Sequence, residues 1–542
     1  MWRIKHRATS GFAALLLLIS AGCVDLEVQN PNAPDANRVF ETPEDVESLI
    51  AGAFKNIHQV AGQNTGPGMA LSNAAFQHQA PWANEGMEYY ARIPRQPLIN
   101  AAGAADGPNI WNAWIWSYRG IAAVRTGLKS IADGETDLGA NDTRARAYGK
   151  LMQGIAHGAI AMLYDSGFIY DETMEFDELA LMGYPDVLTA ALGYLDDAIG
   201  LASGATFTLP TGWMSVPVTA DKMVELAYTF KAQFRANVAR TPTERAAVNW
   251  TAVASDASNG VTEDWEMAVT GWGPDGALWE DTPAWSFYYG GWSMMANYVL
   301  GMADTSGNYQ TWVNSSTGDK MPFYIFTPDT RFPQGGNTTM VAGDVETAQL
   351  ANPGVNAVAN GFLAIMNEGS SRIHSRPDRG TWRWSMYDNG AFTDFGDWVT
   401  EVFPQASTAD LYFLRAEAEY RAGNMGTVAT MVNSTRTLAG LRATNGAGLN
   451  EDCVPRLPNG SCGDLWEMLK WEKRLQAHGI GLFHQGWYYD SRGWGDLMEG
   501  TFLQLPVIYS EYALLGNTPY GYGGVGGESA APVGTYGFID VP

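Results

Sequence analysis

The sequence is poor in cysteine, histidine and basic residues. Its 542 residues include 3 cysteines, 7 histidines and 33 lysines and arginines, against 58 aspartates and glutamates, so the formal net charge is −25. Nucleic acid is therefore not an expected partner, because a polyanion gains little counterion release from so acidic a protein. Beyond its first residues, the chain also lacks an apolar run long enough to cross a bilayer.

Several enzyme motifs are missing as well. The sequence has no His-Glu-x-x-His zinc pair, no Gly-x-Ser-x-Gly elbow and no Walker phosphate loop. His478 and His484 lie near Glu472, but their spacing fits no standard metal pattern. Carboxylates are so numerous that pairs at glycosidase spacing arise by chance. We therefore expect no catalytic residue, no metal and no cofactor.

The first residues have the pattern of a secretory leader. Arg3, Lys5 and Arg7 precede the apolar run 12–19, which is too short to span a bilayer and ends in small residues before Cys23. This pattern predicts a lipoprotein signal peptide at 1–22 and a lipid anchor on Cys23; the alternative is an ordinary cleaved leader with an incidental cysteine. Removing the three basic residues takes the net charge from −25 to −28. Several acyl chains on one cysteine suffice for stable membrane anchoring.

The two other cysteines, Cys453 and Cys462, lie in a loop that contains proline, glycine and asparagine. In an exported protein, outside the reducing cytosol, such a pair is expected to form a local disulfide. Two free thiols are the alternative.

Helical patterns follow a polar tether at 23–39. Thr42 can cap a first helix, Pro43 suits its first turn, and apolar residues recur at helical spacing as far as Ile57. Further helices are predicted at 110–132, 144–163, 185–202, 219–239, 244–257, 408–421, 427–439 and 464–477. In 150–160, small residues alternate with larger ones and permit close helix approach, as in helix pairs that stack neighbour on neighbour.

We therefore expect a mainly α fold in one domain at 40–542. Helical repeats would occupy about 40–260 and 405–480. Between them, about 265–404 is rich in glycine, proline, asparagine and tryptophan and shows no sustained helical period, so it reads as a loop-rich insertion that faces a ligand. The Gly- and Tyr-rich end, about 500–542, is expected to cover the body as an irregular strap.

Four groups of residues resemble one known family when taken in order along the chain. They are Asn30–Pro34 with Thr42–Leu49; Leu411–Glu419 followed by Val432–Arg436; Trp471–Arg474 followed by Gly479–Phe483 and Arg492–Gly495; and Leu505–Ile508 with Glu511 and Asn517. They are similar to motifs of the SusD/RagB family of nutrient-binding outer-membrane lipoproteins. The resemblance implies a SusD-like fold of tetratricopeptide-type helix pairs and a TonB-dependent, SusC-like transporter as partner.

Some matched positions carry charge. Arg415, Glu417, Glu472 and Arg474 are interpreted as buried or half-buried ion partners that orient helices, because a charge inside a helical stack needs a partner.

Aromatic residues give the best indication of a binding surface. A flat ring can stack on the apolar face of a sugar while neighbouring Asn, Asp and Glu side chains bind its hydroxyls. Two stretches fit, 80–90 and 272–292, and the resemblance implies platform aromatics in the first. The candidate ligand-binding residues are Trp82, Asn84, Tyr89, Trp279, Trp285, Tyr288, Tyr289 and Trp292. The alternative is that about half of these rings belong to the core.

The leading hypothesis is a lipid-anchored, surface-exposed outer-membrane protein that binds an oligosaccharide, a polysaccharide or a peptide and delivers it to the transporter. It is not expected to be an enzyme. An outer-membrane polysaccharide hydrolase and a purely structural surface lipoprotein are the two alternatives.

Overall fold

The structure is a computed structural model. It describes residues 42–63, 65–79, 87–105, 107–270, 279–281, 294–320, 323, 325–332, 364–366, 385, 387–389, 400–479, 482 and 486–532. The predicted leader, the tether and Cys23, the predicted lipid anchor, lie outside these residues.

The described part of the chain is mainly helical, which confirms the predicted fold class. The helices are α2 (Pro43–Ala51), α3 (Ala53–Gly62), α4 (Pro67–Ala74), α5 (Met87–Ala91), α6 (Gly107–Ala132), α7 (Asp142–Leu163), α8 (Tyr184–Ala202), α9 (Thr211–Met214), α10 (Ala220–Asn237), α11 (Pro242–Ala247), α12 (Trp250–Asn259), α14 (Asn297–Ala303), α15 (Asn308–Asn314), α17 (Thr408–Arg421), α18 (Met425–Arg436), α19 (Leu465–Gln476), α20 (Gly486–Trp494) and α21 (Tyr509–Leu514).

Short strands and 3-10 turns connect these helices. They are β1 (His78–Gln79), β2 (Ser166–Phe168), β3 (Leu181–Gly183), β4 (Thr208–Leu209), β5 (Val218–Thr219), β6 (Trp265–Thr270), β7 (Met294–Met295), β8 (Ala364–Met366), β9 (Tyr387–Asn389), β10 (Thr400–Ala406), η3 (Gly139–Asn141), η4 (Phe176–Glu178) and η5 (Thr317–Asp319).

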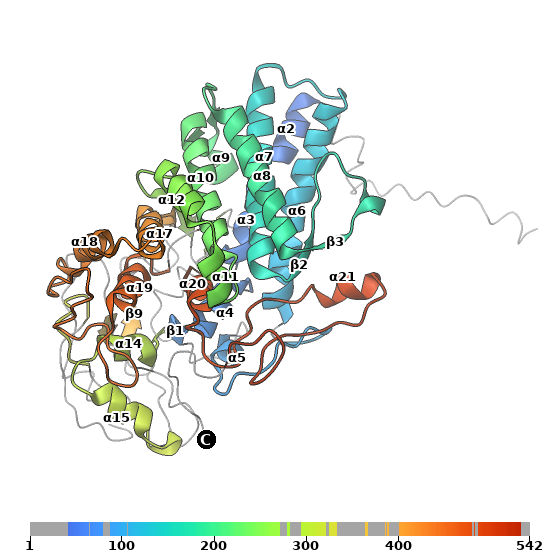
Figure 1. Cartoon of the computed structure of the whole chain (residues 1–542). Helices are drawn as coiled ribbons and strands as arrows, with labels where there is room; N and C mark the ends of the chain where they lie inside the picture. Colours follow the sequence, from blue (N-terminus) through green and yellow to red (C-terminus); the bar gives the residue numbers. More distant parts are fainter. Residues whose placement is uncertain are drawn as a thin grey trace, which may run out of the picture.

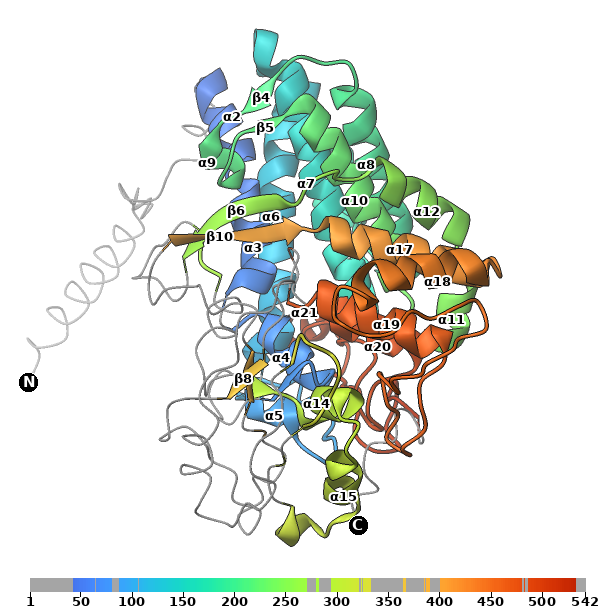
Figure 2. The ribbon, with the colours of Figure 1, turned by 90° about the vertical axis from the view of Figure 1, so that its left-hand side faces the viewer.

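The helices pack neighbour on neighbour in one stack (Figure 1). α3 packs on α6, α6 on α7, α7 on α8, α8 on α10, α10 on α12, α12 on α17, and α17 on both α18 and α19. The view turned by 90° shows the first helices at one end of this stack and α17 to α19 further along it (Figure 2). The stacking of successive helices that the small residues of 150–160 indicated is therefore present.

Side-chain caps explain where several helices begin. Thr42 Oγ1 accepts a hydrogen bond from the Asp45 backbone N–H (3.2 Å), so the predicted first helix start is confirmed. Two predictions about helix length are wrong. The first helix divides at Gly52, a poor helix former, and the helix expected at 244–257 divides into α11 and α12. There Asn249 Oδ1 accepts from the Ala252 N–H (3.1 Å) and starts a new helix.

Two glycines set the close approach of α7 to its neighbours. A Cβ at Gly154 would lie 2.6 Å from the Leu195 side chain of α8, and a Cβ at Gly158 would lie 2.0 Å from the Phe234 ring of α10. Because such distances are far shorter than van der Waals contact, these positions admit only glycine without movement of a buried neighbour.

His157, also on α7, is held as a neutral imidazole. Its Nδ1 lies 2.8 Å from the Gln153 carbonyl oxygen, and its Nε2 accepts a hydrogen bond from the Tyr170 N–H (3.2 Å). These partners fit the tautomer that carries its proton on Nδ1. Burial lowers the pKa of His157 to about 4, because the charged form loses its hydration.

This histidine makes stability dependent on pH. An unfolded histidine takes up its proton near pH 6.5, whereas folded His157 does so only near pH 4, so the unfolded state binds more protons between these values. We expect stability to fall as the pH is lowered through this window, by at most about 1.4 kcal/mol per pH unit for this group. His157→Gln, which keeps a donor and an acceptor, should flatten the slope. Urea midpoints at pH 7, 6, 5 and 4.5 measure this; parallel curves for both proteins would contradict it.

Two buried arginines hold the ends of α7 and α10. Arg240 donates to four carbonyl oxygens at 2.7–3.2 Å. These belong to Ala161, Met162, Tyr164 and Val238. Arg492 donates to the carbonyls of Asn237 and Leu503, both at 2.8 Å. Burial, together with the charge of Arg492, lowers the pKa of Arg240 to about 9. The two guanidinium groups thus satisfy helix-end carbonyls that would otherwise be buried without donors.

A buried ion network joins α11, α17, α19 and α20. The Arg245 Nη2 lies 2.7 Å from Glu417 and 2.9 Å from Asp490, Lys473 lies 2.8 Å from Asp490, and Trp494 Nε1 donates to Glu417 (3.1 Å). All five residues are buried. This network includes Glu417, one of the residues predicted to be a buried ion partner.

Of the other three residues in that prediction, two form buried ion pairs and one lies over an aromatic ring. Glu472 and Arg474 are buried in ion pairs, Glu472 with Arg331 (2.7 Å) and Arg474 with Asp496 (2.5 Å), as predicted. Arg415 is half-buried and lies over the Tyr412 ring, 5.8 Å from its centroid.

The two ends of the loop-rich insertion lie in the same two-stranded sheet. β6 and β10 pair antiparallel, with Thr270 opposite Thr400 and Trp265 opposite Ala406. Within the insertion the structure contains α14 and α15, although the sequence showed no helical period there. Both helices have only 7 residues, too short for an amphipathic period to be visible. α20 and α21 also lie outside the predicted helices, the last of which is 464–477.

Among the described residues, no helix has both the length and the apolar character needed to cross a membrane.

Candidate functional site

A short β-ladder joins the two aromatic stretches singled out in the sequence. β1 and β7 pair antiparallel, with His78 opposite Met295 and Gln79 opposite Met294. The first stretch, 80–90, follows Gln79 directly, and the second, 272–292, ends just before Met294. The start of the first stretch and the end of the second therefore adjoin paired strands, although they are far apart in the sequence.

Most of the candidate residues in these stretches lie outside the described residues. These are Trp82, Asn84, Trp285, Tyr288, Tyr289 and Trp292. Tyr89 and Trp279 are described, and both are half-buried.

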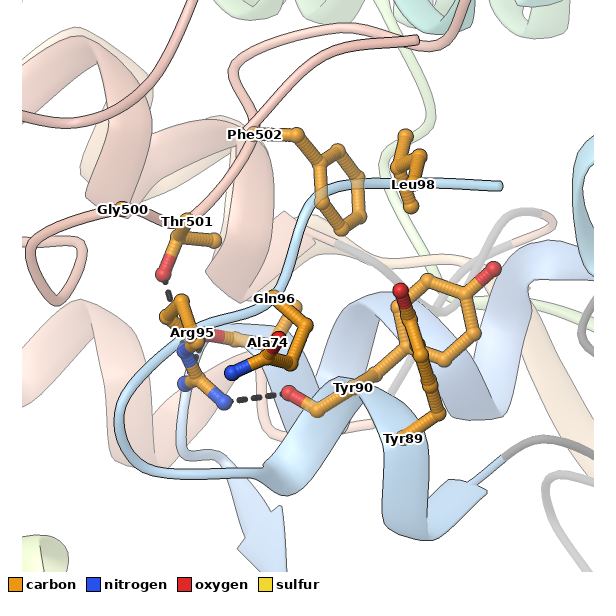
Figure 3. Close-up of a pocket in the computed structure, with 9 residues that line it drawn as sticks. All are labelled: Ala74, Tyr89, Tyr90, Arg95, Gln96, Leu98, Gly500, Thr501 and Phe502. Atoms are coloured by element: carbon orange, nitrogen blue, oxygen red, sulfur yellow. Dashed lines mark hydrogen bonds between the residues drawn. The ribbon is translucent and has the colours of Figure 1, made fainter. Parts of the chain in front are cut away.

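Tyr89 lines a small pocket between α5, the segment after it and the C-terminal strap (Figure 3). The lining residues are Ala74, Tyr89, Tyr90, Arg95, Gln96, Leu98, Gly500, Thr501 and Phe502. The rings of Tyr89 and Tyr90 stand edge to face, 5.8 Å apart. The cavity volume is about 10 Å³, room for about one water molecule. A pocket of this size is too small to enclose a sugar ring.

Arg95 holds the pocket together. It is buried, with its Nη2 donating to the Ala74 carbonyl (2.8 Å), its Nε to Thr501 Oγ1 (3.0 Å) and its Nη1 to the Tyr90 carbonyl. Its guanidinium also lies over the Phe76 ring, 4.3 Å from the centroid. The residue thus links α4, α5 and the strap, and it fixes the backbone that carries Tyr89.

The Tyr89 side chain is itself well fixed. Its hydroxyl donates to the Pro97 carbonyl, and the Arg92 guanidinium lies 5.0 Å from the centroid of its ring. An aromatic ring held in this way is preorganised to stack on a flat ligand surface. Ligand contact by Tyr89 nevertheless stays a prediction.

Trp279 packs against the first helices. Its ring centroid lies 5.6 Å from that of Phe54 and 5.8 Å from that of His58. The following residue also touches α3, where a Cβ at Gly62 would lie 2.5 Å from the Glu280 carbonyl oxygen. Trp279 therefore has a packing role on at least one side. This packing fits the alternative that some of these rings belong to the core. Ligand contact by Trp279 stays a prediction.

Two buried histidines lie beside the ladder. The ring centroids of His78 on β1 and His478, which follows α19, are 5.0 Å apart, and the His478 ring lies 5.5 Å from that of Trp487. Burial lowers the pKa of both, that of His478 to about 3. They are thus uncharged at neutral pH and form part of the packing. Among the described residues, no group of three or more His, Cys, Asp or Glu side chains is placed to hold a metal ion.

Of the residues that line the pocket, only Tyr89 was predicted from the sequence. Arg95, Gln96, Leu98 and the Thr501–Phe502 pair carry no motif, and they meet only because the strap returns to the segment after α5. The strap is held there by Asn100, whose Nδ2 donates to the Val507 carbonyl (2.8 Å). A pairing over such a separation leaves no local pattern for sequence reasoning to use.

Cys453 and Cys462 are joined by a disulfide. The loop they close contacts the insertion through Arg456, whose N–H donates to the Met302 carbonyl (2.8 Å) and whose Nη1 donates to that of Thr305 (3.1 Å).

Solved structures of SusD proteins have a similar fold. A SusD homolog from Parabacteroides distasonis superposes with a TM-score of 0.51 at 13% identity, over 82% of this chain and 84% of that chain. A SusD superfamily protein from Bacteroides thetaiotaomicron gives a TM-score of 0.50 at 12% identity, over 88% of this chain and 97% of that chain. No protein-family model and no curated protein matches the sequence.

These similarities assign the fold. The chain has a mainly helical fold of the SusD/RagB type, as the order of its sequence motifs had indicated. At identities this low, the likeness describes architecture and not the ligand.

Proposed function

We propose that this protein is a binding lipoprotein of the outer membrane. Anchored through a lipid on Cys23, it captures a glycan or a peptide at the cell surface and passes it to a TonB-dependent, SusC-like transporter. The observation that carries the proposal is the pairing of β1 with β7, which brings the start of the first aromatic stretch next to the end of the second. The SusD-type fold supports it.

The chemistry required of such a site is stacking and hydrogen bonding. Tryptophan and tyrosine rings from 80–90 and 272–292 would cover the apolar faces of successive sugars, and Asn84 would bind hydroxyl groups. A carrier has to release what it captures, so its affinity should be moderate. Rings contributed by two chain segments suit this purpose, because each contact contributes little and several act together.

The proposal predicts that ligand affinity depends on Trp82 and Trp285. Replacing both by alanine should weaken binding of the best ligand in a panel of neutral polysaccharides and peptides by about tenfold or more, or about 1.4 kcal/mol. Tryptophan fluorescence and affinity electrophoresis measure this. Phe176→Ala is the matched control, because Phe176 is 79% exposed and lies in the connection between α7 and α8.

Three results would overturn the proposal. The first is that no polysaccharide or peptide binds; the second is that the double variant binds as well as the parent. The third is sustained release of new reducing ends, which would mean a hydrolase. Delivery to a transporter is tested separately, since the full-length protein should co-purify from native membranes with a TonB-dependent channel.

A further inference from the structure

The connection between α7 and α8 projects from the body. Its two ends pair as β2 and β3, with Ser166 opposite Gly183 and Phe168 opposite Leu181, and η4 lies at its tip. In Figure 1 this connection stands out on the right-hand side of the helix stack, the side from which α21 also projects.

Polar contacts hold the connection rigidly in place. Asp171 Oδ1 accepts from the Thr173 N–H (2.8 Å), and Asp171 Oδ2 accepts from the Tyr194 hydroxyl (2.8 Å). Glu172 lies 2.6 Å from Lys150 of α7. Arg125 of α6 donates to the carbonyl oxygen that precedes η4, that of Met174 (2.7 Å).

The tip is ordered by its own side chains as well. The Glu175 and Glu178 side chains form a capping box around η4, each accepting from the backbone N–H of the other. Hydrogen bonds therefore hold the backbone of the tip, while the side chain of Phe176 stays exposed.

The connection presents apolar side chains to solvent. Phe176 is 79% exposed and Met182 is 38% exposed. Burying a phenylalanine stabilises a protein by roughly 1.5–3 kcal/mol, and this gain is absent here although the surrounding backbone is fixed. Rigid display of an aromatic ring is the arrangement found at the anchor points of protein interfaces.

α21 extends the same surface. Its last residue, Leu514, is 82% exposed, and Leu515 is 48% exposed. At the base of the connection, the hydroxyl of Tyr118 of α6 donates to the Phe168 carbonyl of β2 (3.0 Å). Burial, and with it the charge of Glu511 on α21, raises the pKa of that hydroxyl. We call Phe176, Met182, Leu514 and Leu515 the projecting face.

Acidic groups surround the projecting face. Glu175, Asp177 and Glu178 are exposed at the tip, and Glu511 is half-buried on α21. Glu175 lies 3.4 Å from Arg125 and 3.5 Å from Lys129, which also pairs with Asp133 (3.0 Å). A negatively charged membrane surface would repel this rim. A second copy of a chain with net charge −25 would repel it too. Charge complementarity favours a basic protein surface.

We propose that the projecting face is a docking surface for a protein partner that offers an apolar depression rimmed by lysine and arginine. Phe176 and Leu514 would enter the depression, and Asp177 with its neighbours would pair with the rim. The inference stands on these exposed side chains and not on the proposed ligand.

Site-specific photo-crosslinking in intact native membranes tests it with the full-length, lipidated protein. A benzophenone amino acid at position 176 or 514 should crosslink one protein. Its attached peptide should contain apolar residues with lysine or arginine beside them. The matched control is position 438, since Leu438 is 66% exposed but follows α18 in another part of the stack. Yields at 176 and 514 no higher than at 438, or crosslinks to lipid, to a second copy or to an acidic peptide, would overturn the proposal.

Substitutions give a second measurement. Phe176→Ala with Leu514→Ala should reduce the fraction of protein retained on the crosslinked partner at least about tenfold, while Leu438→Ala leaves it unchanged. Asp177→Lys should weaken retention and remove part of its salt dependence. Binding of the polysaccharide panel should stay as in the parent, so failure here and failure of the proposed function are separate results. Equal retention of all variants would refute the docking surface.

Discussion

Arg245→Met is expected to lower the free energy of unfolding by about 3–5 kcal/mol, because it removes a fully buried cation that Glu417 and Asp490 share. Arg245 is fully buried and donates through Nε (3.1 Å) and Nη2 (2.7 Å) to Glu417, and through Nη2 to Asp490 (2.9 Å). In the variant, Lys473 remains beside Asp490, and the partly exposed Arg421 remains 3.0 Å from Glu417. Glu417 therefore loses the only cation that it binds through two hydrogen bonds. Urea denaturation followed by far-UV circular dichroism measures the loss.

A matched control separates burial from charge. Arg442 makes an ion pair of similar length with Asp452 (2.7 Å), but its side chain is 55% exposed. Arg442→Met should therefore cost no more than about 1 kcal/mol. Removing both buried charges, with Arg245→Met and Glu417→Leu, should recover part of the stability lost in the single variant. Equal losses for Arg245→Met and Arg442→Met would contradict this account.

The same network also determines how the stability of the protein changes at low pH. Burial alone would raise the pKa of Glu417, but the charge and hydrogen bonds of Arg245 outweigh it and lower that pKa to about 2. A depressed carboxylate pKa contributes stability that is fully present above about pH 4.5 and is lost as the pH falls toward 2. Part of the acid unfolding of the parent in that range should therefore be missing from the double variant.

The second large effect is expected from Gly158→Val. A Cβ at this position would lie 2.0 Å from the ring of Phe234, which is fully buried. The larger side chain has to push α7 and α10 apart or force a rotamer change, at a cost of about 1–3 kcal/mol. Thermal and urea unfolding should both show this loss.

Gly193→Val on α8 is the control, because no atom lies within 4 Å of a Cβ built there. Both substitutions change helix propensity equally, so their difference isolates the clash. Phe234→Leu combined with Gly158→Val should restore part of the stability, since it removes the ring atoms in question. If the two valine variants were equally stable, close packing at Gly158 could not be the reason for its glycine.

Local patterns were enough to predict much of the helical part. Thr42 and Pro43 indicate the start of α2, and the small residues of 150–160 indicate the close contacts of α7. Both could be predicted because capping and packing periodicity depend on neighbours in the sequence. The breaks at Gly52 and Asn249 escaped the same reasoning. At Asn249 a side-chain cap competes with helix continuation, and at Gly52 the low helix propensity of glycine opposes it; in both cases the difference in free energy is small.

The candidate site was less accessible to sequence reasoning. The aromatic stretches could be recognised by composition, but their approach through Gln79 and Met294 depends on a pairing between distant strands. The role of Arg95, like the partnership of Arg245 with Glu417 from 172 residues away, follows from tertiary contacts that leave no trace in spacing. Composition also cannot separate a platform ring from one that packs on Phe54, as Trp279 does, and ligand contact by Trp279 stays a prediction.

The C-terminal strap also bears on when the protein can finish folding. Tyr520 and Tyr522 donate to the carboxylate of Asp165, just after α7, at 2.6 and 2.7 Å. The Leu505 N–H donates to the carbonyl of Leu163, the last residue of that helix (2.7 Å). Because synthesis starts at the N-terminus, these partners arrive only after α2 to α20 have been made. The helix stack stays open at this end until then, so chaperones and proteases would encounter it in that state. A chain cut near residue 500 would accordingly be a substrate for quality control rather than a shortened binder.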